Sequence, residues 1–277
     1  MSRDLYCVMG NPVEHSRSPW IHARFAELTG QTLHYDKRLV ARDGFVPALH
    51  AFIQEGGRGC NITVPFKFEA AALATHTSAR AALAQACNVL TFHAGSIQAD
   101  NTDGAGLVND IQRNAGLDLK GRHLLLIGAG GAAAGVLGPL LQAGPARMTV
   151  ANRTLAKATA LVAHHAALAL LQKTELLAQE LQGLEGDFDV IINASASSLS
   201  GGGVPVAAST LRPGALAYDM MYGPAAQGFM TWAREHGAVP RDGLGMLVEQ
   251  AAEAFLIWRG VLPPSQAVLA ELRAVMG

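Results

Sequence analysis

The sequence predicts an α/β protein of two domains, and three observations carry this prediction. Short apolar runs alternate with amphipathic helical segments along most of the chain. The 277 residues are enough for two domains of modest size. A glycine-rich turn at 128–133 joins an apolar run to a helical one, as at the strand-to-helix turns of open parallel sheets.

The first domain is predicted over residues 1–101. Apolar and alternating runs predict strands at 5–9, 33–40, 59–64, 88–93 and 96–100, and amphipathic runs predict helices at 19–28, 45–54, 66–75 and 79–84. Ser18 is the expected N-cap of the first helix, with Pro19 at its first position. In the third strand, Cys60, Ile62 and Val64 are expected to share one face.

The second domain is predicted over 102–243. A helix is expected from 102 to about 114, followed by strands at 123–127, 147–151, 188–192 and 215–218, with helices at 131–142 and 155–167. These strands are short and apolar, which is typical of a buried parallel sheet. The glycine cluster 201–203 is expected to be a surface loop. Two final helices within 244–277, separated by Pro263-Pro264, are expected to pack back on the first domain.

Composition excludes several classes of protein. Half the residues are apolar and 16% are charged, which excludes disorder. The net charge of -1 supplies no basic field for nucleic acid or an anionic membrane. Three cysteines without C-x-x-C spacing predict neither a disulfide framework nor a metal site, and no apolar signal segment begins the sequence. We therefore expect a cytoplasmic protein whose partners are small molecules. A monomer or homodimer is expected, although composition does not decide between oligomeric states.

The glycine turn fits the dinucleotide pattern G-x-G-x-x-G/A, with Ala133 in the last place. Gly128 permits a tight turn, Gly130 permits close approach of a pyrophosphate, and the following helix offers unpaired N–H donors. The alternative is a purely structural glycine turn. The strands on both sides favour dinucleotide binding.

The end of the next strand indicates which dinucleotide. NAD-binding folds place an acidic residue there for the ribose 2′-hydroxyl, but this chain has Asn152-Arg153-Thr154 with Lys157 a turn later. The guanidinium of Arg153 and the ammonium of Lys157 suit a 2′-phosphate. A solvated surface pair is the alternative, and NADP is the expected cofactor.

Three polar clusters follow strand ends in the first half of the chain, at 11–19, 61–67 and 101–104. Lys67 falls in the first turn of a helix, where the helix dipole disfavours a cation, whereas a nearby carboxylate such as Asp103 would favour one. Both effects suit a proton-transfer pair, although an ordinary surface lysine stays possible. Gln250 is the polar exception on an apolar helical stripe, so it is either a satisfied core amide or a ligand-facing group.

Taken together, these clusters resemble the shikimate dehydrogenase family, the NADP-dependent enzymes of the aromatic amino-acid pathway. The resemblance spans nearly the whole chain. Its motifs are NPVEHSRSP at 11–19, NITVPFK at 61–67, NTDG at 101–104, GAGGA at 128–132, NRT at 152–154, NAS at 193–195, YDMMYGP at 218–224 and GLGMLVEQAAEAF at 243–255.

The resemblance implies an N-terminal substrate domain, a Rossmann-type NADP domain and reversible reduction of 3-dehydroshikimate to shikimate. It implies that Lys67 and Asp103 are the catalytic pair. The implied substrate-binding residues are Ser16, Ser18, Thr63, Asn88, Tyr222 and Gln250. The implied NADP-binding residues are Gly128, Ala129, Gly130, Gly131, Ala132, Asn152, Arg153, Thr154, Lys157, Met220 and Gly243.

The chain departs from the family pattern at Gln85-Ala86-Cys87, beside Asn88, and at Ala23 and Gln227. Two alternatives therefore stay open. One is a quinate or shikimate dehydrogenase-like paralogue with a shifted substrate or NAD use. The other is a non-catalytic NADP-binding sensor, against which the retention of both Lys67 and Asp103 argues.

Overall fold

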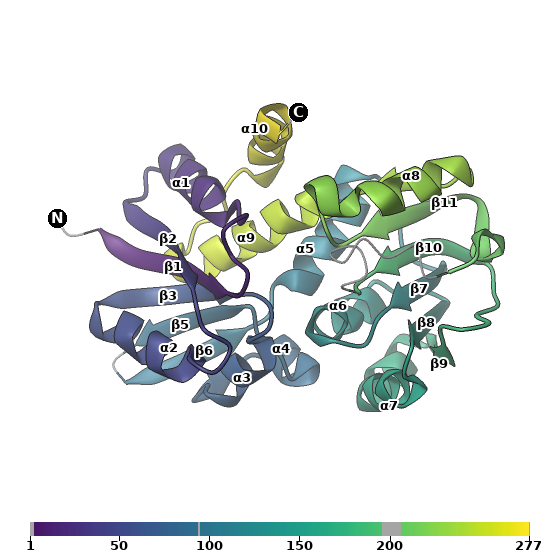
Figure 1. Cartoon of the computed structure of the whole chain (residues 1–277), viewed down its shortest axis with the longest axis horizontal. Helices are drawn as coiled ribbons and strands as arrows, with labels where there is room; N and C mark the ends of the chain where they lie inside the picture. Colours follow the sequence, from purple (N-terminus) through teal and green to yellow (C-terminus); the bar gives the residue numbers. More distant parts are fainter. Residues whose placement is uncertain (1–2, 94, 196–205, 277) are drawn as a thin grey trace. The chain divides into compact units, whose positions relative to one another are not determined.

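The computed structural model describes residues 3–93, 95–195 and 206–276. The chain forms two compact units. Unit 1 contains Met1–Gly106 and Leu247–Gly277, and unit 2 contains Leu107–Met246. Figure 1 labels the elements of both, and each unit is described by itself here. The glycine cluster 201–203, expected as a surface loop, lies outside the described residues.

Unit 1 is built on a mixed six-stranded sheet with the order β2-β1-β3-β5-β6-β4. β1 is parallel to both β2 and β3, while β5 is antiparallel to β3 and β6. The strands are β1 (Asp4–Gly10), β2 (Leu33–Leu39), β3 (Gly57–Ile62), β4 (His76–Thr77), β5 (Val89–His93) and β6 (Ser96–Asp100). The carboxyl ends of β1 and β3 therefore lie side by side, which places the motifs that follow them at one edge of the sheet.

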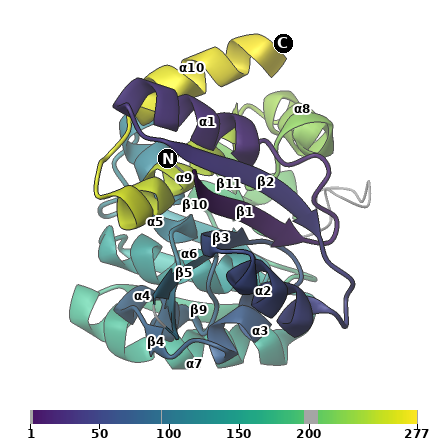
Figure 2. The same ribbon diagram turned by 90° about the vertical axis from the view of Figure 1, so that its left-hand side faces the viewer.

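Helices cover both faces of this sheet (Figure 2). On one face, Phe45 of α2 (Phe45–Gln54) stacks on Phe66, which precedes α3 (Lys67–Ala72), with ring centroids 4.9 Å apart. On the other, Trp258 of α9 stacks on Tyr6 of β1 at 4.7 Å. The remaining helices of the unit are α1 (Ser18–Thr29), α4 (Ala79–Ala84), most of α9 (Leu244–Arg259), α10 (Ser265–Met276) and the start of α5 (Asp103–Asn109).

Three local predictions for unit 1 need correction. β3 ends at Ile62, and Val64 lies in the following turn, where its side chain is 51% exposed instead of aligned with Cys60 and Ile62. Ser18 is the first residue of α1, and Arg17 occupies the N-cap position in its place; the backbone N–H of Ser18 bonds the hydroxyl of Ser16 at 3.3 Å. The short strand β4 is not predicted by the pattern, since its two residues are exposed.

Unit 2 contains a fully parallel sheet with the order β12-β11-β10-β7-β8-β9. Numbered within the unit, this is 3-2-1-4-5-6 read from β9, the Rossmann order. The strands are β7 (His123–Ile127), β8 (Arg147–Asn152), β9 (Glu175–Glu180), β10 (Phe188–Asn193), β11 (Leu211–Asp219) and β12 (Val239–Arg241). The strand order reverses between β7 and β10, so the crevice that binds ligands in such folds is expected at their carboxyl ends.

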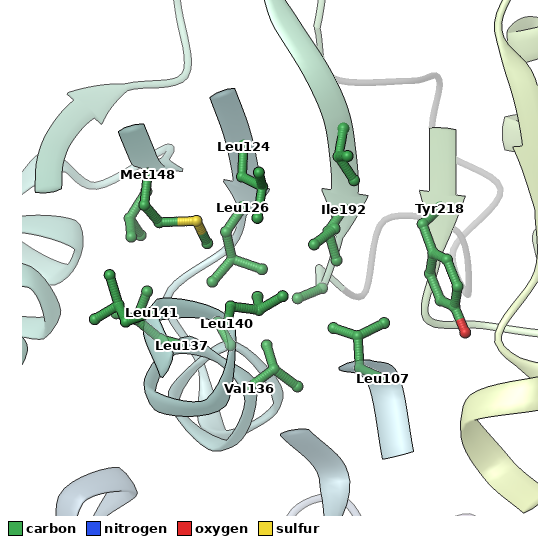
Figure 3. Packing of buried hydrophobic residues seen from close by; sticks show 14 of the residues in the cluster. Leu107, Leu124, Leu126, Val136, Leu137, Leu140, Leu141, Met148, Ile192 and Tyr218 are labelled. Atoms are coloured by element: carbon green, nitrogen blue, oxygen red, sulfur yellow. The ribbon is translucent and has the colours of Figure 1, made fainter. Parts of the chain in front are cut away.

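The core of unit 2 explains why its central strands are apolar throughout. Figure 3 shows one face, where Leu124 and Leu126 of β7 pack against Leu137 and Leu140 of α6 (Gly131–Gln142). On the other face, Leu125 of β7 belongs to a separate buried cluster with residues of α8 (Gln227–Glu235). Both faces of β7 are therefore dry, and a strand buried on both faces reads as a continuous apolar run.

Sequence patterns miss three elements of unit 2 and shorten a fourth. β9 and β12 are the two edge strands and are largely half-buried or exposed, so neither stands out as an apolar run. α8 carries many polar residues, and α7 (Leu155–Gln172) extends five residues beyond the predicted end at 167. The predicted helix near 102–114 is α5 followed by a π-helical segment, Asp110–Asn114. Two short 3₁₀ segments, Ala208–Thr210 and Gly223–Ala226, complete the unit.

A buried carboxylate joins four segments of unit 2. Asp110 has no exposed surface and accepts two hydrogen bonds from the Arg241 guanidinium, at 2.8 and 2.6 Å, and one from the Tyr218 hydroxyl at 2.7 Å. A methyl group on Gly245 would lie 1.8 Å from a carboxylate oxygen of Asp110, so only glycine fits there. The π-helical segment, β11, β12 and the first residues of α9 are thus held at one point.

None of the described helices is long and apolar enough to cross a membrane, and the apolar stretch 124–141 forms β7 and α6. Across the described ranges, no group of His, Cys, Asp and Glu side chains could hold a metal ion. Cys7, Cys60 and Cys87 are buried free thiols.

His22 is a buried titratable group in unit 1. Its side chain has no exposed surface, and its ring stacks on Tyr35 with centroids 4.3 Å apart. Neither ring nitrogen has a hydrogen-bond partner within the described part of the chain. Burial away from water lowers the pKa of His22 to about 3. The folded state therefore holds this ring in its neutral form.

We predict that His22 makes folding stability depend on pH. The unfolded state protonates this ring below its ordinary pKa of 6.5, while the folded state does not until about pH 3. Stability is therefore lost as the pH falls below 6.5, by at most about 1.4 kcal/mol per pH unit from this group. Urea unfolding of the wild type and His22→Phe at pH 7.5 and 5 measures this slope. Equal losses of stability in both proteins would contradict the prediction.

Candidate active site

Lys67 and Asp103 are in direct contact within unit 1. Lys67 is the first residue of α3 and Asp103 the first residue of α5, and the ammonium group donates a hydrogen bond to the carboxylate. The two side chains are 14% and 8% exposed, so the pair is largely removed from water but can still be reached. Lys67 and Asp103 are 36 residues apart in the sequence, but their contact makes the motifs NITVPFK and NTDG neighbours in the fold.

The side-chain amide of Asn88 organises the surroundings of this pair. Its nitrogen lies 2.8 Å from the carboxylate of Asp103, 3.0 Å from the hydroxyl of Thr102 and 3.1 Å from the amide oxygen of Gln250. Its oxygen accepts the backbone N–H of Thr102 at 2.8 Å. Because an amide nitrogen carries two hydrogens, three acceptors share two donors, and the network leaves Asp103 oriented toward Lys67.

Gln250 is a satisfied amide and a member of this network, which confirms the first of its two alternatives, while a contact with a ligand stays a prediction. Its amide nitrogen donates to the carbonyl of Leu247 at 2.9 Å, while its oxygen faces Asn88 and Thr102. Thr102 has no exposed surface and belongs to the same network, although the sequence did not single it out as a site residue. The available signal was its place between Asn101 and Asp103 in the motif NTDG.

Ser16, Ser18 and Thr63 follow the carboxyl ends of β1 and β3. The Ser16 hydroxyl donates to that of Ser18 at 3.2 Å, so the serines form a pair. The backbone N–H of Thr63 bonds the carbonyl of Met9 of β1 at 2.9 Å. A methyl group on Gly10 would lie 2.2 Å from the Thr63 side chain, and glycine at position 10 therefore permits the two strand ends to close on each other.

The glycine turn of unit 2 has the backbone that an anion site needs. Gly128 directly follows β7 with φ of +110°, a conformation that favours glycine. Gly130 precedes α6. Among the described residues, no side chain caps that helix, and none apart from the two chain neighbours of Gly130 comes within 4 Å of the position a methyl group would occupy. Ala129, Gly131 and Ala132 are half-buried around it. The first-turn N–H groups of α6 are thus placed for a pyrophosphate.

The basic cluster after β8 belongs to the same edge of the sheet. β7 and β8 are parallel neighbours, so Asn152 at the end of β8 lies one strand away from the glycine turn. The Asn152 amide donates to the carbonyl of Thr154 at 3.0 Å and shapes the turn. Arg153, Thr154 and Lys157 are exposed beyond it. A dinucleotide with a 2′-phosphate fits this donor set.

Met220 and Gly243 lie at the other side of the same edge, after β11 and β12. The N–H of Met220 bonds the carbonyl of Asn193, and the N–H of Gly243 bonds the carbonyl of Met221 at 2.9 Å. A methyl group on Gly243 would come within 2.3 Å of the Met220 carbonyl oxygen, so glycine is required here. Tyr222 is half-buried in the same turn. Among the expected substrate-binding residues, Tyr222 alone belongs to unit 2.

Three family profiles match this chain. The profile for the shikimate dehydrogenase substrate binding domain matches residues 8–90. The profile for shikimate / quinate 5-dehydrogenase matches residues 110–200, and that for the shikimate 5'-dehydrogenase C-terminal domain matches residues 243–273. Together they cover most of the chain and fall in the order expected for the family.

Individual relatives agree with these profiles. The chain is 71% identical to a shikimate dehydrogenase (NADP(+)) of Acidovorax sp. (strain JS42), covering 99% of this chain and 97% of the relative. Among solved structures, it is similar to an Ael1 enzyme from Pseudomonas putida, with a TM-score of 0.87 and 45% identity over 97% of this chain and 98% of the other. It is also similar to a shikimate 5-dehydrogenase from Thermus thermophilus in complex with NADP(H) and shikimate, with a TM-score of 0.84 and 28% identity over 98% and 99% of the two chains. The chain belongs to the shikimate dehydrogenase family.

Proposed function

We propose that this protein reduces 3-dehydroshikimate to shikimate reversibly with NADPH, within aromatic amino-acid biosynthesis. The observation that carries this proposal is the Lys67–Asp103 pair held by the Asn88 amide. The name of the Acidovorax relative and the glycine turn of unit 2 support it. A binding protein would have no use for a nearly buried ammonium–carboxylate pair at the start of two helices.

In the proposed mechanism, Lys67 is the acid and Asp103 its orienting partner. NADPH, when bound, supplies a hydride to the carbonyl carbon of the substrate. The Lys67 ammonium donates a proton to the oxygen on which negative charge develops, and a hydroxyl results. In the oxidative direction, neutral Lys67 takes the proton back. Asp103 stabilises the ammonium form and fixes the direction in which its N–H points.

The other groups of unit 1 are proposed to hold the substrate. A cyclic acid with three oxygen substituents needs several donors and acceptors in fixed directions, which hydroxyls and amides supply. Ser16 and Ser18 form one pair of hydroxyls, and Asn88 and Gln250 supply amides next to Asp103. We assign the same role to Thr63 and, from unit 2, Tyr222.

The proposed NADP site lies on unit 2. The glycine turn at 128–132 is assigned to the pyrophosphate, and Arg153 with Lys157 to the 2′-phosphate. Asn152 and Thr154 shape the turn that carries these cations, and Met220 with Gly243 would line the nicotinamide end. No acidic residue occurs from 152 to 157, so nothing there would repel the 2′-phosphate.

Quinate dehydrogenation is a second candidate, because the profile over residues 110–200 covers both activities. The departure at position 87 changes little physically. Cys87 is buried beside the pair, and burial raises the pKa of its thiol to about 12, so it behaves as a small apolar residue. We also propose that the protein is cytoplasmic, which its three free thiols support, and that it is a monomer or a homodimer.

A matrix of two substrates and two cofactors tests the function. Absorbance of the reduced nicotinamide is followed for shikimate and quinate, each with NADP⁺ and NAD⁺, on the purified protein. The proposal expects the highest kcat/KM for shikimate with NADP⁺. Tight NADP⁺ binding without turnover of either acid would indicate a sensor instead, and preference for quinate or NAD⁺ would indicate the paralogue.

We predict that Lys67→Ala lowers kcat by about 10²- to 10⁴-fold and changes the KM for shikimate little, because proton transfer is lost while the hydroxyl and amide contacts stay. Steady-state kinetics measures both constants. Lys120→Ala is the matched control, since Lys120 is an exposed lysine of unit 2 that belongs to none of the proposed sites. A kcat for Lys67→Ala near that of the control would remove Lys67 from the chemistry.

We predict that Arg153→Ala raises the KM for NADPH by about 10- to 100-fold through loss of charge-assisted hydrogen bonds to the 2′-phosphate. The KM for NADH should stay the same, because NADH lacks that phosphate. Arg147→Ala serves as the control, since Arg147 begins the strand that Arg153 follows and pairs with Glu175. Equal effects on both cofactors would contradict the assignment.

A further inference from the structure

We infer that Asp219 is a positioning residue for the nicotinamide end of the cofactor, an inference that rests on the proposed function. Asp219 is the last residue of β11 and has no exposed surface. It belongs to none of the residue sets assigned above to substrate or NADP. Two of its contacts, described below, link it to the turn at 220–222 and to Asn193 of β10.

The carboxylate of Asp219 holds this turn from one side. One oxygen accepts the backbone N–H of Met221 at 2.9 Å. From the other side, the N–H of Gly243 bonds the carbonyl of Met221 at 2.9 Å, in the close approach that glycine at 243 permits. Both polar groups of the Met221 backbone are therefore fixed. Because these two bonds hold the backbone of Met221, they also place its neighbours Met220 and Tyr222.

The same carboxylate is connected to the point where the strand order reverses. Its second oxygen lies 3.4 Å from the amide nitrogen of Asn193, the residue paired with Asp219 in the β10–β11 register. Asn193 ends β10, and its own carbonyl accepts the N–H of Met220. Next to it, Ala194 donates its N–H to the carbonyl of Ile127 and packs on Gly128. Asp219 and Asn193 thus link the turn at 220–222 to the glycine turn.

This link requires that both polar side-chain atoms of residue 219 are hydrogen-bond acceptors. An amide in place of the carboxylate would present an N–H₂ group either to the Met221 N–H or to the Asn193 amide nitrogen. Because the Asn193 oxygen already accepts the N–H and the hydroxyl of Ser195, one of the two contacts would become donor against donor. In a site without exposed surface, that loss is not repaired by water. The turn at 220–222 would shift, whereas Arg153 and Lys157, carried by the loop after β8, would not.

The test separates the two ends of the cofactor. Binding constants for NADP⁺ and for adenosine 2′,5′-bisphosphate, which lacks the nicotinamide, are compared in the wild type and Asp219→Asn. We expect unchanged affinity for the bisphosphate, weaker NADP⁺ binding and a kcat lower by about 10- to 100-fold, the effect of displacing a reacting group by roughly 1 Å. The primary isotope effect on kcat with NADPH deuterated at the transferred position should rise, because hydride transfer becomes slower than product release.

Asp189→Asn is the matched control. Asp189 lies near the amino end of β10, far along the strand from Asn193, and accepts the backbone N–H of His123 at 2.8 Å. The change from Asp to Asn at the amino end of β10 should leave the affinities for NADP⁺ and for the bisphosphate, and the isotope effect, as in the wild type. If Asp219→Asn does not fold, Asn193→Ala removes one donor to the carboxylate and should give the same pattern with a smaller loss.

Three results would overturn the inference. The first is a kcat of Asp219→Asn equal to that of the control. The second is an equal loss of affinity for the bisphosphate and for NADP⁺. The third is a lower kcat with an unchanged isotope effect, because that combination indicates that fewer molecules are active. Failure of the proposed function looks different, because the wild type itself would then oxidise no shikimate. In that case the ratio of the two binding constants still decides whether Asp219 positions the nicotinamide end.

Discussion

The buried amide of Asn88 is the contact on which the substrate half of this protein depends. Its backbone completes the sheet, with its carbonyl accepting the N–H of Ile62 at 2.8 Å and its N–H bonding the carbonyl of Asp100 at 3.1 Å. Its side chain then joins Thr102, Asp103 and Gln250. A polar network of this kind is stable inside a protein only when its members satisfy one another. The network therefore sets the geometry of the reactive pair, Lys67 and Asp103.

Both units use the same structural logic although their sheets differ. Apolar strands form a dry core, and the polar residues begin where the strands end. In unit 1 these residues follow β1, β3 and β6, and in unit 2 they follow β7, β8, β10 and β11. Parallel neighbouring strands end at one edge, so short motifs that are far apart in the sequence become neighbours without any long loop.

Two ion-paired carboxylates, one in each unit, differ in accessibility: Asp110 has no exposed surface, whereas the Asp103 side chain is 8% exposed. Asp110 has no exposed surface, is held by the fork of Arg241, and is packed so tightly that Gly245 admits no side chain. Lys67 and Asp103 retain some exposure, and each begins a helix at the edge of the sheet. A sealed carboxylate fixes four segments of unit 2, whereas a reachable pair can exchange a proton with a ligand.

The sequence by itself determined the apolar strands, the glycine turn, the basic residues that favour NADP and the two motifs that carry Lys67 and Asp103, because each is a local pattern of residue types. It did not reveal the edge strands β9 and β12, the exposed Val64, or the place of Thr102 in the Asn88 network. Only the tertiary structure decided those, and with them the joining of Asp110 to Tyr218 and Arg241 across 108 and 131 residues. Periodicity reports what a segment buries, but a hydrogen bond between distant side chains exists only once the sheets have brought them together.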